Sequence, residues 1–153
     1  MTIEELIKVN SPLSLPKKTV LSILYSQIVI TEKFSEVLKP YELSEEQFNV
    51  LRILRGQKEH SANMCVIQER MIAKTSNTTR LVDKLLLKQL VTREVCPDNR
   101  RKIDVKITGK GLSILAELDP KIIDLESSFA SNLSEPELEL LNILLEKYRT
   151  ITN

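Results

Sequence analysis

The strongest constraint on the fold is the order of patterns between Thr75 and Lys106, where one helical segment runs into two short strand-like segments. Over about Ser76 to Lys88, apolar residues recur at helical spacing: Leu81, Val82, Leu85 and Leu86. Residues 90–95 and 102–107 have the pattern of paired strands, and the loop between them contains the turn-forming sequence Pro-Asp-Asn. This part of the chain therefore predicts an amphipathic helix followed by a β-hairpin.

The sequence before this segment predicts further helices, in agreement with a composition that includes only three glycines. A short helix is expected over residues 3–9, and a long one with a broad apolar stripe over residues 17–38. Ser44 opens a capping box with Gln47, and the helix that it starts should end at Gly56. A polar loop at 57–61 and a short helix at 62–71 complete this half.

The sequence after the hairpin predicts two more helices. Thr108 is placed to cap a long helix that contains Pro120, where a kink is expected. Ser134 and Glu137 form a second capping box, which starts a final amphipathic helix. The predicted fold is mostly α with a small β-hairpin wing: a winged helix-turn-helix with long helices at both ends of the chain, which suit a dimer.

The charges are distributed unevenly along the chain, although its formal net charge is only +1. Between Arg70 and Lys110 there are 11 basic and four acidic residues, a net charge of +7. The rest of the chain has 11 basic and 17 acidic residues, a net charge of −6. This asymmetry is typical of a local phosphate-binding face on an acidic body, and it predicts double-stranded DNA as a partner.

The predicted helix and hairpin supply the residue types that read DNA. A helix that begins with small hydrogen-bonding residues can enter a major groove, while an arginine at a hairpin tip can reach the adjacent minor groove. The candidate groove contacts are Ser76, Asn77, Thr78 and Arg80, with Lys84 on a phosphate. At the hairpin tip the candidates are Asp98, Arg100 and Arg101. Ser76 could instead serve only as a helix cap, and Arg101 could pair with Asp98 or Asp104.

Several other classes of protein find no support in the sequence. There is no nucleophile elbow, phosphate loop or paired acid–base motif, so an enzyme is not expected. The single histidine, His60, lies in a polar loop where solvent exposure is expected, and no set of metal ligands or cofactor motif accompanies it. No apolar run has membrane-spanning length, and residues 1–9 lack the apolar core of a signal peptide, so the expected location is the cytoplasm.

Four motifs in order resemble the MarR (multiple-antibiotic-resistance regulator) family. They are Leu43-Ser44-Glu45-Glu46-Gln47-Phe48-Asn49-Val50-Leu51, Thr79-Arg80-Leu81-Val82-Asp83-Lys84-Leu85, Pro97-Asp98-Asn99-Arg100-Arg101 and Ile107-Thr108-Gly109-Lys110-Gly111. The resemblance covers roughly residues 17–150. It implies a single domain over 1–153, with a DNA-binding lobe at about 43–111 and dimerisation helices at about 17–38 and 112–150.

The resemblance also implies a function. A homodimeric cytoplasmic transcription regulator, most often a repressor, would bind a pseudo-palindromic operator, with Arg100 in the minor groove and Asp98 orienting it. A small aromatic effector would bind in a cleft between the dimer helices and the lobe. The sequence departs from the family at Gln89, where the family commonly has Gly after the recognition helix, which predicts a strained or differently shaped helix end.

Two alternatives stay open at this point. A winged helix can serve as a protein-interaction module that uses its basic face for an acidic partner. Some members of the resembled family sense oxidants through cysteine, but their sensing position lies in the first long helix, which has no cysteine here. Cys65 and Cys96 therefore favour an interpretation as small filler residues.

Overall fold

The computed structural model describes residues 1–9, 11–73, 77–95 and 103–150. A short helix α1 (Ile3–Leu6) precedes a long helix α2 (Leu15–Leu38), which continues into the 3-10 turn η1 (Lys39–Tyr41). Next come α3 (Glu45–Arg55), the 3-10 turn η2 (Lys58–His60), strand β1 (Ser61–Asn63), α4 (Met64–Arg70) and α5 (Thr78–Leu87). Strands β2 (Val91–Val95) and β3 (Ile103–Ile107) lead into α6 (Gly109–Ala130) and α7 (Glu135–Arg149).

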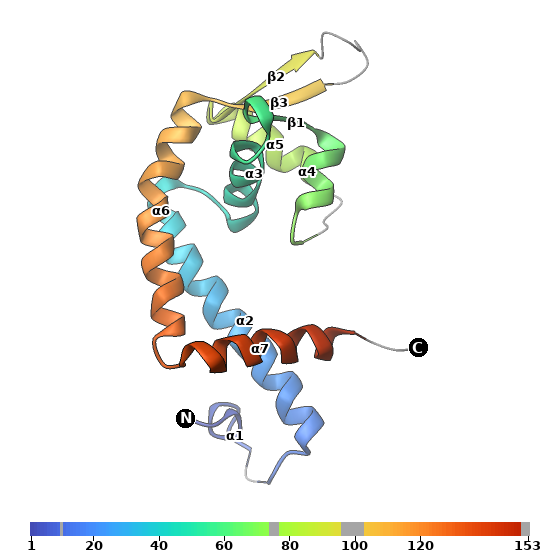
Figure 1. Cartoon of the computed structure of the whole chain (residues 1–153), viewed down its shortest axis with the longest axis vertical. Helices are drawn as coiled ribbons and strands as arrows, with labels where there is room; N and C mark the ends of the chain where they lie inside the picture. Colours follow the sequence, from blue (N-terminus) through green and yellow to red (C-terminus); the bar gives the residue numbers. More distant parts are fainter. Residues whose placement is uncertain (10, 74–76, 96–102, 151–153) are drawn as a thin grey trace.

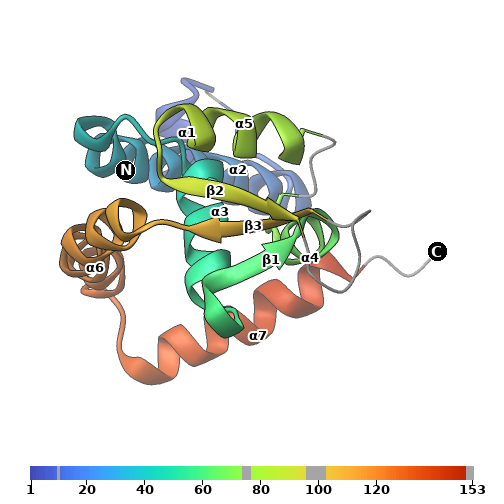
Figure 2. The same cartoon turned by 90° about the horizontal axis from the view of Figure 1, so that it is seen from above.

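The elements form a lobe at one end of the molecule, from which two long helices extend. Figure 1 shows α3, α4, α5 and the sheet gathered in this lobe, with α2 and α6 running away from it and α7 at the opposite end. Seen from above, the three strands lie in the order β1-β3-β2, with every neighbouring pair antiparallel (Figure 2). This arrangement is the predicted winged helix-turn-helix, with long helices before and after it in the sequence.

The buried core explains why the lobe holds together. Its fully buried side chains come from the end of α2, from α3 to α5, from β3 and from the first half of α6: Leu38, Val50, Leu51, Leu54, Ile67, Val82, Leu85, Val105, Leu115 and Leu118. Burying a side chain of this size contributes roughly 1.5–3 kcal/mol each. The helices therefore need one another, and the lobe needs the adjoining ends of α2 and α6.

The predicted caps of α3, α6 and α7 are confirmed. Ser44 Oγ accepts from the Gln47 amide while the Gln47 side chain accepts from the Ser44 amide, both at 3.2 Å. Thr108 Oγ1 accepts from the Gly111 amide at 3.1 Å, and the Glu137 carboxylate accepts from the Ser134 amide at 2.7 Å. Each cap satisfies an amide group that the first helical turn leaves without a partner.

Several boundaries differ from the predictions, among them the start of α2, which is Leu15. Residues 61–63, expected as the end of a loop and the start of a helix, form β1, because Ala62 pairs with Val105 and is buried. Three residues are too few to carry an alternating pattern, so only the partner strand reveals them. The first helix spans Ile3–Leu6, shorter than expected, and α5 begins at Thr78 with Asn77 as its N-cap. Ser76, the possible cap named from the sequence, lies outside the described residues.

No helix among the described residues combines the length and the apolar character needed to cross a membrane. Pro120 lies inside α6, which continues through it from Gly109 to Ala130.

Candidate nucleic-acid interface

Helix α5 has one buried face and one exposed face. Thr78, Val82 and Leu85 are buried, and they recur at the i, i+4, i+7 spacing of a single helical stripe. The exposed residues lie on the opposite side: Thr79, Arg80, Lys84 and Leu87. This exposed face is called the outer face of α5 below, and it is where a ligand as large as DNA could approach the helix.

Thr78 corrects the sequence-based assignment, which left it on or near the surface. Its side chain is only 4% exposed, whereas that of the following residue, Thr79, is exposed. The sequence did contain the signal, because Thr78 continues the stripe of Val82 and Leu85 one turn toward the N-terminus. Of the other predicted groove contacts, Asn77, Arg80 and Lys84 are exposed, and Ser76 lies outside the described residues.

The base of the wing is tied to α5 by an ion pair. An Arg93 guanidinium nitrogen on β2 lies 2.6 Å from Asp83 Oδ1 on α5. Beyond Val91, every residue of β2 is exposed, so the outer half of the wing projects from the lobe. The last described pair of the wing joins Val95 with Ile103. The predicted tip residues Asp98, Arg100 and Arg101 lie outside the described residues, as does Cys96.

The end of α5 has the hydrogen bonds of a Schellman motif. The Gln89 amide donates to the Leu86 carbonyl at 2.9 Å, and the Leu90 amide donates to the Leu85 carbonyl at 3.0 Å. Gln89 has a φ of 60°, the left-handed conformation that favours glycine. Buried Leu85 and Leu90 supply the apolar contact that commonly accompanies this motif. The strained helix end expected from Gln89 is therefore confirmed.

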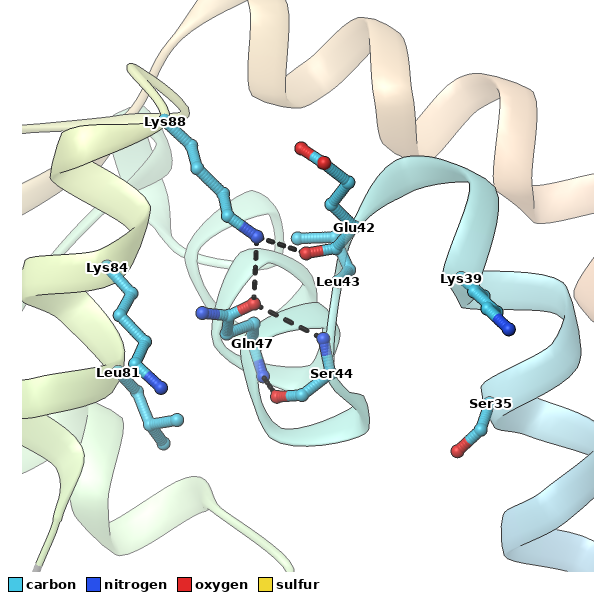
Figure 3. A pocket seen from close by; sticks show the side chains of 9 residues that line it. All are labelled: Ser35, Lys39, Glu42, Leu43, Ser44, Gln47, Leu81, Lys84 and Lys88. Atoms are coloured by element: carbon cyan, nitrogen blue, oxygen red, sulfur yellow. Dashed lines mark hydrogen bonds between the residues drawn. The ribbon is translucent and has the colours of Figure 1, made fainter.

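Lys88, one turn after Lys84, bonds within the protein. Its ammonium donates to the Glu42 carbonyl and lies 3.5 Å from Gln47 Oε1 (Figure 3). No sequence pattern indicates these contacts, since Lys88 and Glu42 are 46 residues apart.

An open cleft lies beside the outer face of α5. It has a volume of about 470 Å³ and lies between the end of α2, the start of α3 and one side of α5. Its lining includes Lys39, Lys84 and Lys88, one carboxylate from Glu42, and the apolar side chains of Leu43 and Leu81 (Figure 3). The excess of ammonium groups over carboxylates makes this cleft attractive to anions.

The lobe is also joined to α6 by polar contacts. Arg55 at the end of α3 makes two hydrogen bonds to the Asp119 carboxylate, at 2.7 and 3.0 Å. These bonds favour the ionised carboxylate and hold the pKa of Asp119 below its ordinary value. Two residues further along α6, the Lys121 ammonium bonds to the Tyr41 hydroxyl at 2.8 Å.

The other candidate residues have simple environments. His60 is exposed, as expected, and its Nδ1 lies 2.9 Å from the Arg55 carbonyl oxygen. Cys65 is exposed in the first turn of α4. Within the described ranges, no three His, Cys, Asp or Glu side chains gather closely enough to hold a metal ion.

Comparisons with known proteins identify the lobe. The sequence model of the MarR family matches residues 43–103, a span that holds α3, α4, α5 and β2. Over these residues the chain matches the MarR family. Among curated relatives, the HTH-type transcriptional regulator MhqR of Bacillus subtilis is 28% identical over 118 residues. These residues are 77% of this chain and 80% of MhqR.

Solved structures share the fold of this chain. Bordetella bronchiseptica BpsR, whose DNA binding is regulated by 6-hydroxynicotinic acid, has a TM-score of 0.79 at 19% identity. The likeness covers 93% of this chain and all of the BpsR chain. Streptomyces coelicolor Sco3205, a MarR family transcriptional regulator solved in complex with DNA, has a TM-score of 0.76 at 16% identity. The likeness covers 92% of this chain and 91% of the Sco3205 chain.

Proposed function

We propose that the chain is a sequence-specific transcription regulator that binds a pseudo-palindromic operator as a homodimer. The observation that carries the proposal is the exposed Thr79, Arg80 and Lys84 on the outer face of α5, next to a projecting wing, within the segment of net charge +7. Side chains of these types bond to base edges and phosphates in a major groove. A dimer that covers an operator blocks access to it, so repression is the simplest outcome.

The predicted contacts divide by role. Asn77 and Arg80 are the candidates for base edges, because Asn pairs well with adenine and Arg with guanine. Lys84 is the candidate for a phosphate. Ser76 remains a candidate from its place before α5, whereas buried Thr78 is replaced by exposed Thr79. On the wing, Arg100 would enter the minor groove with Asp98 orienting it, and Arg101 would contact phosphate.

Exposed apolar surface supports the homodimer. Of the 24 residues of helix α2, only Leu38 is buried. The apolar side chains of Leu24 and Ile28 on this helix are 50% and 53% exposed. Helix α7 has no buried residue, and its Leu140 and Ile143 are 54% and 61% exposed. Such surface is normally covered by a partner. A second copy, docked through residues 17–38 and 112–150, would cover it, and sedimentation equilibrium should give twice the chain mass.

The lobe and the two dimerisation segments would make up one domain over residues 1–153, acting in the cytoplasm. For the effector, we place a small aromatic acid in the cleft of about 470 Å³, which lies between a dimer helix and the lobe. Its volume falls within the range of small-molecule sites, and Lys39 and Lys84 would attract a carboxylate. The effect of 6-hydroxynicotinic acid on BpsR supports this chemical class.

The test begins with a selection of bound sequences from a random duplex library, followed by gel-shift titration at several salt concentrations. A regulator should prefer one palindrome, and its affinity should fall steeply with salt because bound lysines and arginines release counterions. Equal affinity for all duplexes, with a weak salt dependence, would favour the alternative of a protein-interaction module.

The wing assignment has its own variant. Arg100→Ala should lower operator affinity at fixed salt by at least about tenfold, or roughly 1.4 kcal/mol, because a rigidly held guanidinium in the minor groove is lost. Lys58→Ala is the control, since it removes an equal charge from an exposed position between α3 and β1 that is not among the candidate contacts. Equal dissociation constants for Arg100→Ala and the wild type would remove Arg100 from the interface.

A further inference from the structure

Two lysines connect the end of α5 to both long helices. The Lys110 ammonium, in the first turn of α6, donates to the Lys88 carbonyl at 3.0 Å. The Lys88 ammonium in turn donates to the Glu42 carbonyl, at the end of η1, which continues α2. Lys88 therefore bonds to the end of η1 through its side chain and to α6 through its backbone carbonyl.

Both bonds have the same physical basis. The last carbonyl groups of a helix lack partners within the helix, and they carry the negative end of its dipole. A lysine ammonium placed there satisfies a carbonyl and meets favourable charge. Lys110 thus caps the C-terminal end of α5, and Lys88 caps the C-terminal end of the α2–η1 unit. Each cap joins elements that are far apart in sequence, by 22 and 46 residues.

We propose that Lys88 and Lys110 are positioning residues that hold α5 at a fixed orientation to α2 and α6. This inference rests on the proposed function, because α2 and α6 lead to the dimerisation surface while α5 carries the outer face. Because α5 is held to these two helices, the position of its outer face is fixed relative to the outer face of α5 in the second copy. The two lysines thereby determine which spacing of half-sites the dimer accepts.

The environment of Lys88 separates it from Lys84, one turn earlier on α5. Lys84 is exposed on the outer face, but Lys88 is half-buried, and its ammonium points toward Glu42 and Gln47 (Figure 3). Gln47 is itself 4% exposed and held in the capping box of α3. The Lys88 ammonium therefore points into the cleft between α2, α3 and α5, where it bonds to the protein itself.

The Lys110 bond between α5 and α6 is accompanied by other hydrogen bonds between the same elements. Next to the Lys110 bond, Thr108 Oγ1 donates to the Gln89 carbonyl at 2.9 Å, and the Thr108 amide donates to the Leu90 carbonyl at 3.0 Å. These bonds continue to tie α5 to α6 after Lys110 is changed. Lys88→Met should therefore have the larger effect, and Lys110→Met a smaller effect of the same kind.

The test compares Lys88→Met and Lys110→Met with Lys58→Met, a control that removes an equal charge from an exposed position between α3 and β1. The probes are the duplex selected by the wild type, the same duplex with one base pair added or removed between half-sites, and a single half-site. Lys88→Met should weaken binding to the complete operator about tenfold, in the usual range of coupling between sites. Binding to the half-site should fall less than about twofold, with the salt slope unchanged.

Spacing preference is the readout that a purely structural role would not change. Lys88→Met should lose part of the wild type's discrimination against the altered spacings, while Lys58→Met keeps it. If Lys88→Met instead weakens complete operator and half-site equally, and lowers the salt slope by about 1, then Lys88 contacts a phosphate and the proposal is wrong. Unaltered binding to all probes would also overturn it. Should Lys88→Met fail to fold, Lys110→Met provides the same comparison.

A measurement without DNA separates this inference from the proposed function. Spin labels at Leu87→Cys, in a chain with Cys65→Ser and Cys96→Ser, report the distance between the two α5 helices of the dimer. Leu87 is 85% exposed, so a label there should not disturb packing. Lys88→Met should broaden the distance distribution, and an unchanged distribution would contradict the positioning role. A wild type that binds no duplex specifically would refute the proposed function alone.

Discussion

Gly111, in the first turn of α6, lies at the closest approach between this helix and the base of the wing. The site is buried, and a β-carbon added there would lie 2.6 Å from the Leu90 carbonyl oxygen and 2.7 Å from Ile107 Cγ1. Both distances are far below van der Waals contact, and the first involves backbone. We therefore expect Gly111→Ala to force α6 away from the junction of α5, β2 and β3.

The size of the effect follows from three contributions. Alanine is favoured over glycine in a helix by about 1 kcal/mol. Overpacking a tight site costs about 1–3 kcal/mol. Displacing the Leu90 carbonyl also weakens its 3.0 Å bond from the Thr108 amide, a loss of about 1 kcal/mol. The net expectation is a destabilisation of about 2 kcal/mol, or a fall in Tm of roughly 4–8 °C for a chain of this length.

The assay is chemical and thermal unfolding at one fixed protein concentration, since the stability of a dimer depends on concentration. Gly109→Ala is the matched control, because it makes the same substitution two residues earlier in α6, where an added β-carbon meets nothing within 4 Å. The control should be neutral or more stable than the wild type by about 0.5 kcal/mol. If Gly111→Ala proves as stable as Gly109→Ala, the close approach at Gly111 does not constrain the protein.

Two further predictions concern stability. Gln89→Gly should stabilise the protein by about 0.5–1 kcal/mol, because glycine relieves the left-handed backbone at φ 60° and keeps the Schellman bonds; a lower urea midpoint than the wild type would contradict this. Asp119→Asn should destabilise by at most about 1 kcal/mol at neutral pH, since its pair with Arg55 is 33–41% exposed. Because the pKa of Asp119 is lowered in the folded state, this difference should be present above its ordinary value of 3.8 and vanish as the pH falls through the lower, folded value. A gap between wild type and variant that persists in acid would refute the assignment.

Elements with strong local signals were predicted well from the sequence. The capping boxes at Ser44 and Ser134 locate the starts of α3 and α7, because a cap is made by residues three positions apart. Strand β1 was missed, because its three residues are held by pairing with β3, about 40 positions later. Pairing at that distance leaves no local pattern.

In the candidate site too, local spacing predicts the exposure of some residues, while other contacts depend on tertiary packing. Exposed Asn77, Arg80 and Lys84 agree with the helical spacing, and the buried Thr78 was missed although the spacing contained it. The sequence could not distinguish Lys84 from Lys88, since both are lysines on one helix. Only the position of Glu42, brought beside Lys88 by the packing of α2 and α3 on α5, separates their roles.

The sequence by itself determined the order of the long helices, the hairpin and the basic character of residues 70–110, because these depend on periodicity, caps and composition. Its four motifs carried the resemblance to the MarR family. The tertiary structure decided how α5 is held between α2 and α6, and where α6 comes closest to the wing base at Gly111. The two lysine contacts join residues 22 and 46 positions apart, and the close approach at Gly111 involves Leu90, which lies earlier in the chain before β2. The packing of the whole core sets the geometry of these contacts.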